Sequence, residues 1–191
     1  MEKLESISVF CGSTSGVDAN FAKKARNLGL EMAKRGITLV YGGGYRGLMG
    51  IVAESCYENN GKVIGVLPEV FNHDKVLSKK VESELIIVPD MHARKKKVYD
   101  LADAFIIMPG GIGTMDEFFE IFTWRQIGYH NKNIALYNID GFYDSLLEHL
   151  KRCTREGFLK DMMLSSLIIE DDAKNLIDKL SEERIVLPLK Y

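Results

Sequence analysis

Short apolar runs alternate with longer amphipathic segments along most of this chain. The apolar runs are continuous, which is typical of strands that are covered on both faces. They lie at residues 7–11, 37–41, 63–67, 85–88, 104–108, 134–137 and 167–169. Alternating strands and helices predict an α/β fold, in which a doubly wound parallel sheet of about seven strands carries helices on both faces.

The intervals between these runs have the spacing of helices. Helices are expected at residues 18–34, 48–60, 90–102, 114–129, 141–156 and 171–180. In the first, Asp18 suits the N-cap position, and Phe21, Ala25, Leu28 and Met32 follow at the spacing of a buried stripe. The irregular stretch from residue 68 to residue 83 is polar and charged, which predicts a lid or a surface loop.

Length and composition exclude several classes of protein. A chain of 191 residues predicts one domain, residues 1–191, and a hydrophobic share of 46% argues against disorder. A formal net charge of −2 argues against nucleic acid as a partner. No apolar run approaches the roughly 20 residues that cross a membrane, and the N-terminus lacks the layout of a signal peptide. Three separated cysteines (Cys11, Cys56 and Cys153) without a CxxC motif favour a reducing, cytoplasmic compartment.

Nearly half of the 17 glycines fall in two short windows. Five lie within residues 42–50 and three within residues 110–113. Each window directly follows an expected strand, as does the small-residue stretch 12–16, and ligands bind at the carboxyl ends of parallel strands. Glycine lets backbone amides approach a phosphate, and a following helix adds its dipole. The three loops therefore predict a site for a phosphate-bearing ligand.

The first window also fits a dinucleotide fingerprint. Gly42, Gly44 and Gly47 form GxGxxG, and Glu69 lies about twenty residues beyond, where an NAD enzyme places its ribose-binding acid. Against an NAD-dependent oxidoreductase, the motif follows the second strand and leaves little chain for a substrate domain. A tight turn with close helix–strand packing is the other interpretation. The chain has no GxxxxGK[ST] motif, which excludes a P-loop NTPase.

The second window precedes a carboxylate with two interpretations. Thr114 and Glu117 have the spacing of a capping box, in which Glu117 would serve the helix start. A carboxylate beside a phosphate-binding loop is also well placed to act on a sugar. The two roles are compatible.

A basic run occupies the expected helix 90–102. At 3.6 residues per turn, Arg94 and Lys95 share a face with apolar residues, whereas Lys96 points to the opposite side. Charges on an inward face need an acidic partner or an anionic ligand, and a guanidinium suits phosphate or carboxylate. The four histidines (His73, His92, His130 and His149) are scattered, so no metal site is expected.

Together these segments resemble a known family. Residues 9–13 (VFCGS), 39–44 (LVYGGG), 47–50 (GLMG), 91–95 (MHARK), 109–117 (PGGIGTMDE) and 123–132 (TWRQIGYHNK) are similar to the LOG (LONELY GUY) family of cytokinin riboside 5'-monophosphate phosphoribohydrolases, long mislabelled lysine decarboxylases. The resemblance extends from about residue 6 to residue 157. Asp116 stands where the family usually has Glu, and Ala93 stands where Glu or Gln is common.

The resemblance implies a Rossmann-like fold, a homodimer or larger homo-oligomer, and hydrolysis of the N-glycosidic bond of a nucleoside 5'-monophosphate without a cofactor. AMP or an N6-substituted AMP would yield the free base and ribose 5-phosphate. Arg94 and Glu117 match the family's catalytic pair, and Glu69 matches a base-side acid only weakly. The substrate-binding residues expected from the family and the adjoining loops are Lys95, Gly110, Gly111, Ile112, Gly113, Thr114, Met115, Asp116, Thr123, Gly12, Ser13, Gly43, Gly44 and Met91.

Other hypotheses stay open at this point. A nucleotide-binding carrier or sensor without turnover could share the fold and the loops. An amino-acid decarboxylase would need a Schiff-base lysine and pyridoxal phosphate, and no lysine is singled out for that role. Trp124 lies on an expected helix with Phe118, Phe119 and Phe122, which fits a subunit interface or an internal core equally well.

Overall fold

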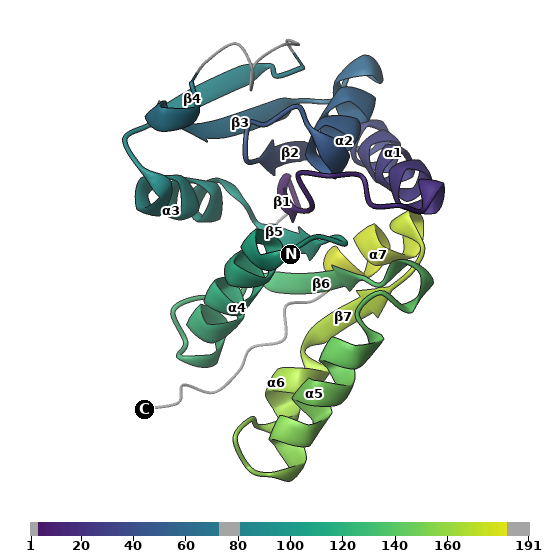
Figure 1. The fold of residues 1–191 in the computed structure, drawn as a ribbon, viewed down its shortest axis with the longest axis vertical. Coiled ribbons are helices and arrows are strands. Elements are labelled where there is room, and N and C mark those ends of the chain that lie inside the picture. The colour runs from purple at the N-terminus through teal and green to yellow at the C-terminus, as the bar shows by residue number, and fades with distance from the viewer. Residues whose placement is uncertain (1–3, 73–80, 183–191) are drawn as a thin grey trace.

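A computed structural model of the chain describes residues 4–72 and 81–182. Seven strands form one sheet in the order β4-β3-β2-β1-β5-β6-β7 (Figure 1). They are β1 (Ser6–Phe10), β2 (Thr38–Tyr41), β3 (Val63–Pro68), β4 (Glu84–Val88), β5 (Ala104–Ile107), β6 (Asn133–Tyr137) and β7 (Leu167–Glu170). Every neighbouring pair is parallel, which confirms the predicted α/β class and the Rossmann-like fold.

The chain enters the sheet at its centre. β1 pairs with both β2 and β5. The chain first moves outward from β1 to β4 and then returns to the other side of β1 to begin β5. In sheets of this kind, the crevice at the carboxyl ends of the two strands where the order reverses is the usual ligand site. Here those strands are β1 and β5.

Helices cover both faces of the sheet. They are α1 (Ala19–Lys34), α2 (Gly47–Glu58), α3 (Met91–Leu101), α4 (Ile112–Gln126), α5 (Asp144–Arg155), α6 (Asp161–Ser165) and α7 (Ala173–Leu180), with short 3-10 turns η1 (Glu69–Phe71) and η2 (Ile139–Gly141). One core cluster joins α1, α2 and α7 to the sheet. A second cluster joins α3, α4, α5 and α6 to the other face of the sheet. Figure 1 shows α3 and α4 on one side of the strands and α1, α2 and α7 on the other.

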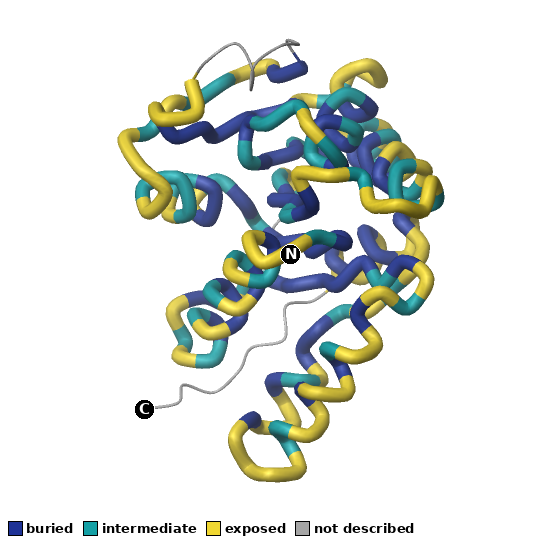
Figure 2. The backbone as a smooth tube through the Cα atoms, in the orientation of Figure 1, coloured by how far each residue is buried: buried dark blue, intermediate teal, exposed yellow. Residues whose placement is uncertain are grey.

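Apart from the partly exposed edge strands β4 and β7, the strands are buried because they lie between these two layers. In Figure 2 they are mostly dark blue, and the outer faces of the helices are yellow. Successive residues of β5 alternate between the clusters: Ala104 and Ile106 belong to one, Phe105 and Ile107 to the other. In α1, Ala25, Leu28 and Met32 are fully buried, as their spacing predicts, and burying a side chain such as Leu28 contributes about 1.5–3 kcal/mol.

Several boundaries differ from those expected. Asp18 caps α1 and accepts a hydrogen bond from the Asn20 amide, as predicted. The expected helix at 141–156 is wrong at its start, because Asp140 and Gly141 adopt left-handed φ angles of 52° and 73° and α5 begins only at Asp144. Helix α6 was not expected. The expected lid or surface loop at 68–83 falls partly outside the described residues, since 73–80 are not among them.

Over the two described ranges, no helix combines the length and the apolar character that crossing a membrane requires.

Candidate active site

Three loops meet at the carboxyl ends of β1, β2 and β5. The Gly12 amide, after β1, donates a hydrogen bond to the Pro109 carbonyl oxygen, after β5, at 3.0 Å. The Leu48 amide, in the first turn of α2, donates to the Gly12 carbonyl oxygen, also at 3.0 Å. The predicted convergence of the loops is therefore confirmed.

Two glycines permit this close packing. Gly47 has a left-handed φ of 60°, and a β-carbon there would lie 2.3 Å from the carbonyl carbon of Ser13. A β-carbon at Gly110 would lie 2.2 Å from the Thr114 hydroxyl oxygen and 2.9 Å from the Gly12 amide nitrogen. All three distances are below 3.0 Å, shorter than real Cβ contacts, so a side chain at either position would separate the loops.

The loops enclose a cavity of about 270 Å³. It is lined by Gly12, Thr14, Ser15, Gly16, Phe21, Leu48, Pro109, Gly110, Gly111 and Phe142. Phe21 and Phe142 meet edge to face with ring centroids 5.8 Å apart. Neither was predicted to belong to the site, and no spacing in the sequence links Phe142 to the glycine loops.

Helix α4 begins at this cavity. Its N-cap is Gly111, and no side chain caps the helix there. The first amides of a helix have no intrahelical acceptor and attract anions. A β-carbon at Gly111 or Gly113 would meet no atom within 4 Å, so the backbone at both positions faces open space. The helix start can therefore receive a phosphate.

The capping-box interpretation of Thr114 and Glu117 is wrong. Because α4 starts at Ile112, Glu117 lies past the first turn instead of at the third helical position that the motif requires. Its carboxylate Oε1 instead accepts a hydrogen bond from Nη2 of Arg94, on α3. The exposed fractions of these two side chains are 13% for Glu117 and 16% for Arg94.

Helix α3 and the first glycine window place Arg94. The Asp90 side chain caps α3 by accepting a hydrogen bond from the Ala93 amide at 2.8 Å. A β-carbon at Gly42 would lie 3.4 Å from Nη1 of Arg94, so the guanidinium rests against the backbone that follows β2. The prediction that Arg94 faces inward is confirmed.

Burial dominates the electrostatics of Glu117. Desolvation raises the pKa of this carboxyl to about 7, although the positive charges of Arg94 and Lys95 oppose the shift. Asp116 and Glu120 add to the rise. Burial also raises the pKa of the neighbouring Cys11 thiol, and the Glu117 charge strengthens that effect. A partly buried carboxyl whose pKa is raised by desolvation beside a charged partner is a candidate for a functional group, although neither Glu117 nor Arg94 lines the cavity itself.

Lys95 binds acidic partners on α4. Its ammonium lies 2.8 Å from an Asp116 carboxylate oxygen and 3.5 Å from one of Glu120. Burial acts to lower the pKa of Lys95, but the two carboxylates outweigh it and raise that pKa. Lys96 instead forms a 2.6 Å surface ion pair with Asp100, as its outward direction predicts.

The remaining predicted residues are spread around these groups. Gly43 packs on Leu67, and Gly44 on Met49. Ser13, Ile112 and Met91 are exposed, whereas Thr114 is buried and Met115 half-buried. Thr123 is exposed on α4, about 13 Å along the helix from Thr114, and the structure does not bring it to the loops. Glu69 is exposed in η1.

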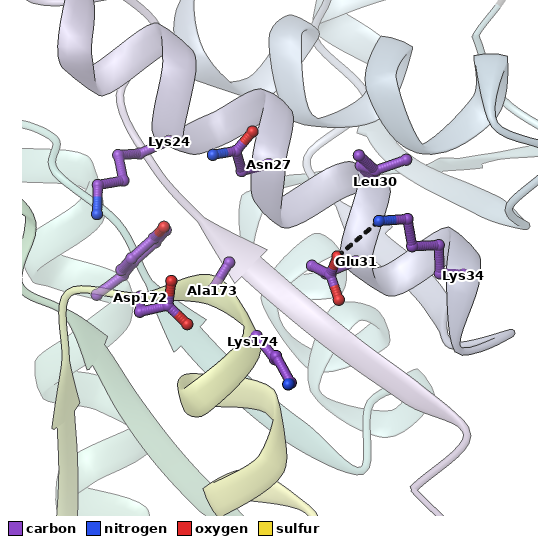
Figure 3. A pocket seen from close by; sticks show the side chains of 9 residues that line it. Lys24, Asn27, Leu30, Glu31, Lys34, Asp172, Ala173 and Lys174 are labelled. Carbon is purple, nitrogen blue, oxygen red and sulfur yellow. Dashed lines mark hydrogen bonds and ion pairs between the residues drawn. The ribbon is translucent and has the colours of Figure 1, made fainter.

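A second cavity, of about 290 Å³, lies between α1 and α7 (Figure 3). None of the predicted site residues lines it. Its charges are largely matched within the protein: Lys34 pairs with Glu31 at 3.0 Å, Lys24 donates to the Asp171 carbonyl oxygen, and Asp172 caps α7. We therefore place the site at the glycine loops.

Among the described residues, no group of three or more His, Cys, Asp or Glu side chains could hold a metal ion.

Comparisons with known proteins show which family the chain belongs to. A family model described as "Possible lysine decarboxylase" matches residues 49–180. The cytokinin riboside 5'-monophosphate phosphoribohydrolase LOG4 of Arabidopsis thaliana is 41% identical over 94% of this chain and 83% of its own length. A probable cytokinin riboside 5'-monophosphate phosphoribohydrolase, LOGL1 of Oryza sativa subsp. japonica, is 42% identical over 92% and 78%. The chain belongs to the LOG family.

The match to the LOG family model includes Arg94, Glu117 and the second glycine window, whereas Gly12 and Ser13 precede it. More distant proteins share the LOG fold alone. The molybdenum cofactor binding protein of Rippkaea orientalis superposes with a TM-score of 0.70 at 20% identity, covering 94% of this chain and 97% of its own. The Moco carrier protein of Chlamydomonas reinhardtii gives 0.67 at 21% identity, covering 93% and 98%.

Proposed function

We propose that this chain is a phosphoribohydrolase. It cleaves the N-glycosidic bond of nucleoside 5'-monophosphates, AMP or an N6-substituted cytokinin riboside 5'-monophosphate. Water supplies a hydroxyl to the sugar and a proton to the base, so the products are free base and ribose 5-phosphate. The observation that carries the proposal is the half-buried Arg94–Glu117 pair beside an uncapped helix start. The activity named for the relatives that are about 40% identical supports it.

The phosphate and the carboxylate are suitably spaced for one nucleotide. The phosphate would bind the amides at the start of α4, in the loop from Gly110 to Thr114. Glu117 follows Ile112 by five residues, which is about 7.5 Å along a helix and comparable to the span of a ribose from its 5'-phosphate to C1'. Its carboxylate would hold the ribose hydroxyls and stabilise the oxocarbenium-like transition state.

Arg94 has a different role because its guanidinium stays charged. It would keep Glu117 ionised in the complex and stabilise negative charge on the leaving base or the phosphate. The other predicted substrate contacts near these groups remain part of the proposal: Lys95, Gly111, Gly113, Met115, Asp116, Gly12, Ser13, Gly43, Gly44 and Met91. Thr123, which the structure does not bring to the loops, is not among them.

Two alternatives fit the site less well. A decarboxylase needs a neutral, nucleophilic lysine, but two carboxylates raise the pKa of Lys95 and keep it protonated. In the NAD hypothesis the first glycine window would bind the cofactor. Gly42 and Gly47 instead pack against Arg94 and the Ser13 backbone.

Three variants test the proposal. Glu117→Gln and Arg94→Ala should each lower kcat for AMP hydrolysis by about 100-fold or more, as removal of a group that stabilises transition-state charge does. Lys96→Ala, on the same helix but at the surface, should leave the rate unchanged. A folded Glu117→Gln enzyme with the wild-type rate would remove the carboxylate from the mechanism. AMP binding without base release by the wild type would favour the carrier alternative.

We also propose a single cytoplasmic domain that acts as a homodimer or larger homo-oligomer, without a cofactor and without nucleic acid or membrane as partners. Apolar side chains exposed on and after α4, including Ile112, Phe119 and Ile127, support self-association. Cys11, Cys56 and Cys153 are free, in accord with a reducing compartment.

A further inference from the structure

A buried hydrogen bond near the site joins two residues that the proposed mechanism does not use. Tyr41 ends β2 and is fully buried, and Glu82, which precedes β4, is 7% exposed. The Tyr41 hydroxyl donates to Oε1 of Glu82, while Oε2 accepts a hydrogen bond from the Val81 amide at 3.2 Å. Burial and the bond to Glu82 raise the pKa of Tyr41, so its hydroxyl keeps its proton and acts as the donor.

Glu82 reaches Tyr41 across an intervening strand. β3 lies between β2 and β4, and Gly65 of β3 pairs in register with Tyr41 on one side and Leu85 on the other. A β-carbon at Gly65 would lie 3.1 Å from Cγ of Glu82 and 3.2 Å from Cα of Gly43. A side chain at position 65 would therefore occupy the space that the Glu82 side chain uses.

The Tyr41–Glu82 hydrogen bond adjoins the turn that supports Arg94. Gly42 follows Tyr41 directly, and the Arg94 guanidinium lies against its backbone. Gly43 has a left-handed φ of 74° and packs between Gly65 and Leu67. Cys11 is close enough to both Tyr41 and Glu117 to interact electrostatically with each. Tyr41 thus directly precedes the glycine against which the Arg94 guanidinium packs.

We propose that Tyr41 and Glu82 are positioning residues. Their hydrogen bond, which crosses β3 at Gly65, fixes the turn from Gly42 to Gly44 and thereby the guanidinium of Arg94 beside Glu117. The expected effect of these residues on the catalytic rate rests on the proposed function, whereas their effect on the position of the Arg94 guanidinium does not. Small displacements of a positioned group reduce the chemical rate more than they reduce binding.

Kinetics of Tyr41→Phe test this inference. With AMP, kcat should fall about tenfold while KM stays within about twofold, because Arg94 would be displaced without removing the phosphate site. Tyr137→Phe is the matched control: it removes a hydroxyl from another fully buried tyrosine at the carboxyl end of a strand, beside the α1–α7 cavity. It should leave kcat unchanged. A Tyr41→Phe enzyme that loses thermal stability but keeps its kcat would overturn the inference.

The conservative change at Glu82 tests the hydrogen bond itself. Glu82→Gln keeps an oxygen that can accept from Tyr41, so it should retain most of the rate, whereas Glu82→Leu should resemble Tyr41→Phe. In an Arg94→Ala background, Tyr41→Phe should cause no additional loss, since both changes act through one group. An additional full tenfold loss there would contradict action through Arg94.

A readout independent of turnover separates this inference from the proposed function. The NMR resonance of the Arg94 guanidinium, assigned by its loss in Arg94→Lys, should shift in Tyr41→Phe and stay in place in Tyr137→Phe. If the wild type releases no base from any nucleotide, the proposed function fails and the resonance still decides the positioning role. An unchanged resonance in Tyr41→Phe would refute that role whatever the activity.

Discussion

At the scale of single residues, burial and charge act in opposite directions on Glu117. Desolvation by burial raises the pKa of Glu117, and the positive charge of its ion-pair partner Arg94 partly offsets the rise. The spacing of the basic run predicts that Arg94 and Lys95 face inward and need acidic partners, but it does not say which carboxylates they meet. Those partners come from α4, and only the packing of α3 beside α4 brings them together.

The raised pKa of Glu117 predicts a pH dependence of catalysis. If the carboxylate is the active form, kcat/KM should rise with pH through about 7 and then level off, since this ratio reports groups of the free enzyme. The residual activity of Glu117→Gln should lack that rise. The substrate phosphate titrates near 6 in both enzymes and serves as the internal control. Parallel pH profiles for the two enzymes would contradict the assignment.

Gly113 offers a test that separates stability from binding. Gly113 lies in α4, and a β-carbon there would point into open space. Because Ala favours the helix more than Gly does, Gly113→Ala should raise the free energy of unfolding by about 0.5–1 kcal/mol. The added methyl group should raise KM severalfold, because it blocks the approach of a phosphate to the helix start. Gly110→Ala, which would collide with Thr114, should instead destabilise the fold. Urea unfolding and initial rates measure both effects, and an unchanged KM in Gly113→Ala would remove the phosphate from this position.

At the scale of elements, α3 and α4 carry the proposed catalytic residues, and both helices follow strands that end at the same edge of the sheet. Apolar periodicity predicts most of the strands and helices, because their buried faces repeat with the period of each element. The start of α4 is not predictable in this way: Thr114 and Glu117 imitate a capping box, whereas the helix begins at Ile112, after the N-cap Gly111, without a side-chain cap. The interruption before α5 depends on the left-handed Asp140 and Gly141. This Asp-Gly pair is itself a turn signal, so the sequence does indicate the break that the expected helix at 141–156 ignores.

Two equivalent helix caps, on α3 and on α7, allow the contribution of α3 to catalysis to be separated from its contribution to stability. Asp90 caps α3 and Asp172 caps α7 through the same kind of hydrogen bond, at 2.8 and 3.0 Å. Replacing either with Ala should cost about 1 kcal/mol of stability. Only Asp90→Ala should also lower kcat/KM, because α3 holds Arg94 and α7 holds no proposed site residue. Equal effects on kcat/KM would show that the caps act through global stability alone.

At the scale of the whole molecule, the reversal of strand order at β1 brings three loops distant in sequence into one site. Strand–helix alternation predicts this convergence, since parallel strands present their carboxyl ends at one edge. The contact of Glu82 with Tyr41 was not predictable, because it depends on the order of β2, β3 and β4 and on a missing side chain at Gly65. Phe142 was not predicted to line the cavity, because it reaches the glycine loops only through the packing of the segment between η2 and α5 against Phe21 of α1.

The exposed apolar side chains on and after α4 lead to a prediction about assembly. Trp124 is half-buried against Tyr99 and Tyr129, so it belongs in part to the core, but Phe119, Ile127 and Tyr129 remain 42–58% exposed. We expect sedimentation velocity to give a dimer or larger species. Phe119→Glu should shift that species toward the monomer, whereas Phe158→Glu, at an exposed position in the turn after α5, should not. A monomeric wild type at micromolar concentration would contradict the prediction.

The most direct test of the central claim is an analysis of products from a panel of substrates. Purified enzyme is incubated with AMP, isopentenyl-AMP, GMP and CMP, and with adenosine as the matched compound that lacks the 5'-phosphate. Chromatography then quantifies free base and ribose 5-phosphate. We predict equal amounts of base and ribose 5-phosphate from at least one adenine nucleotide and no base from adenosine, because the start of α4 must hold a phosphate. Base release from adenosine at the same rate, or no release from any nucleotide, would contradict the account.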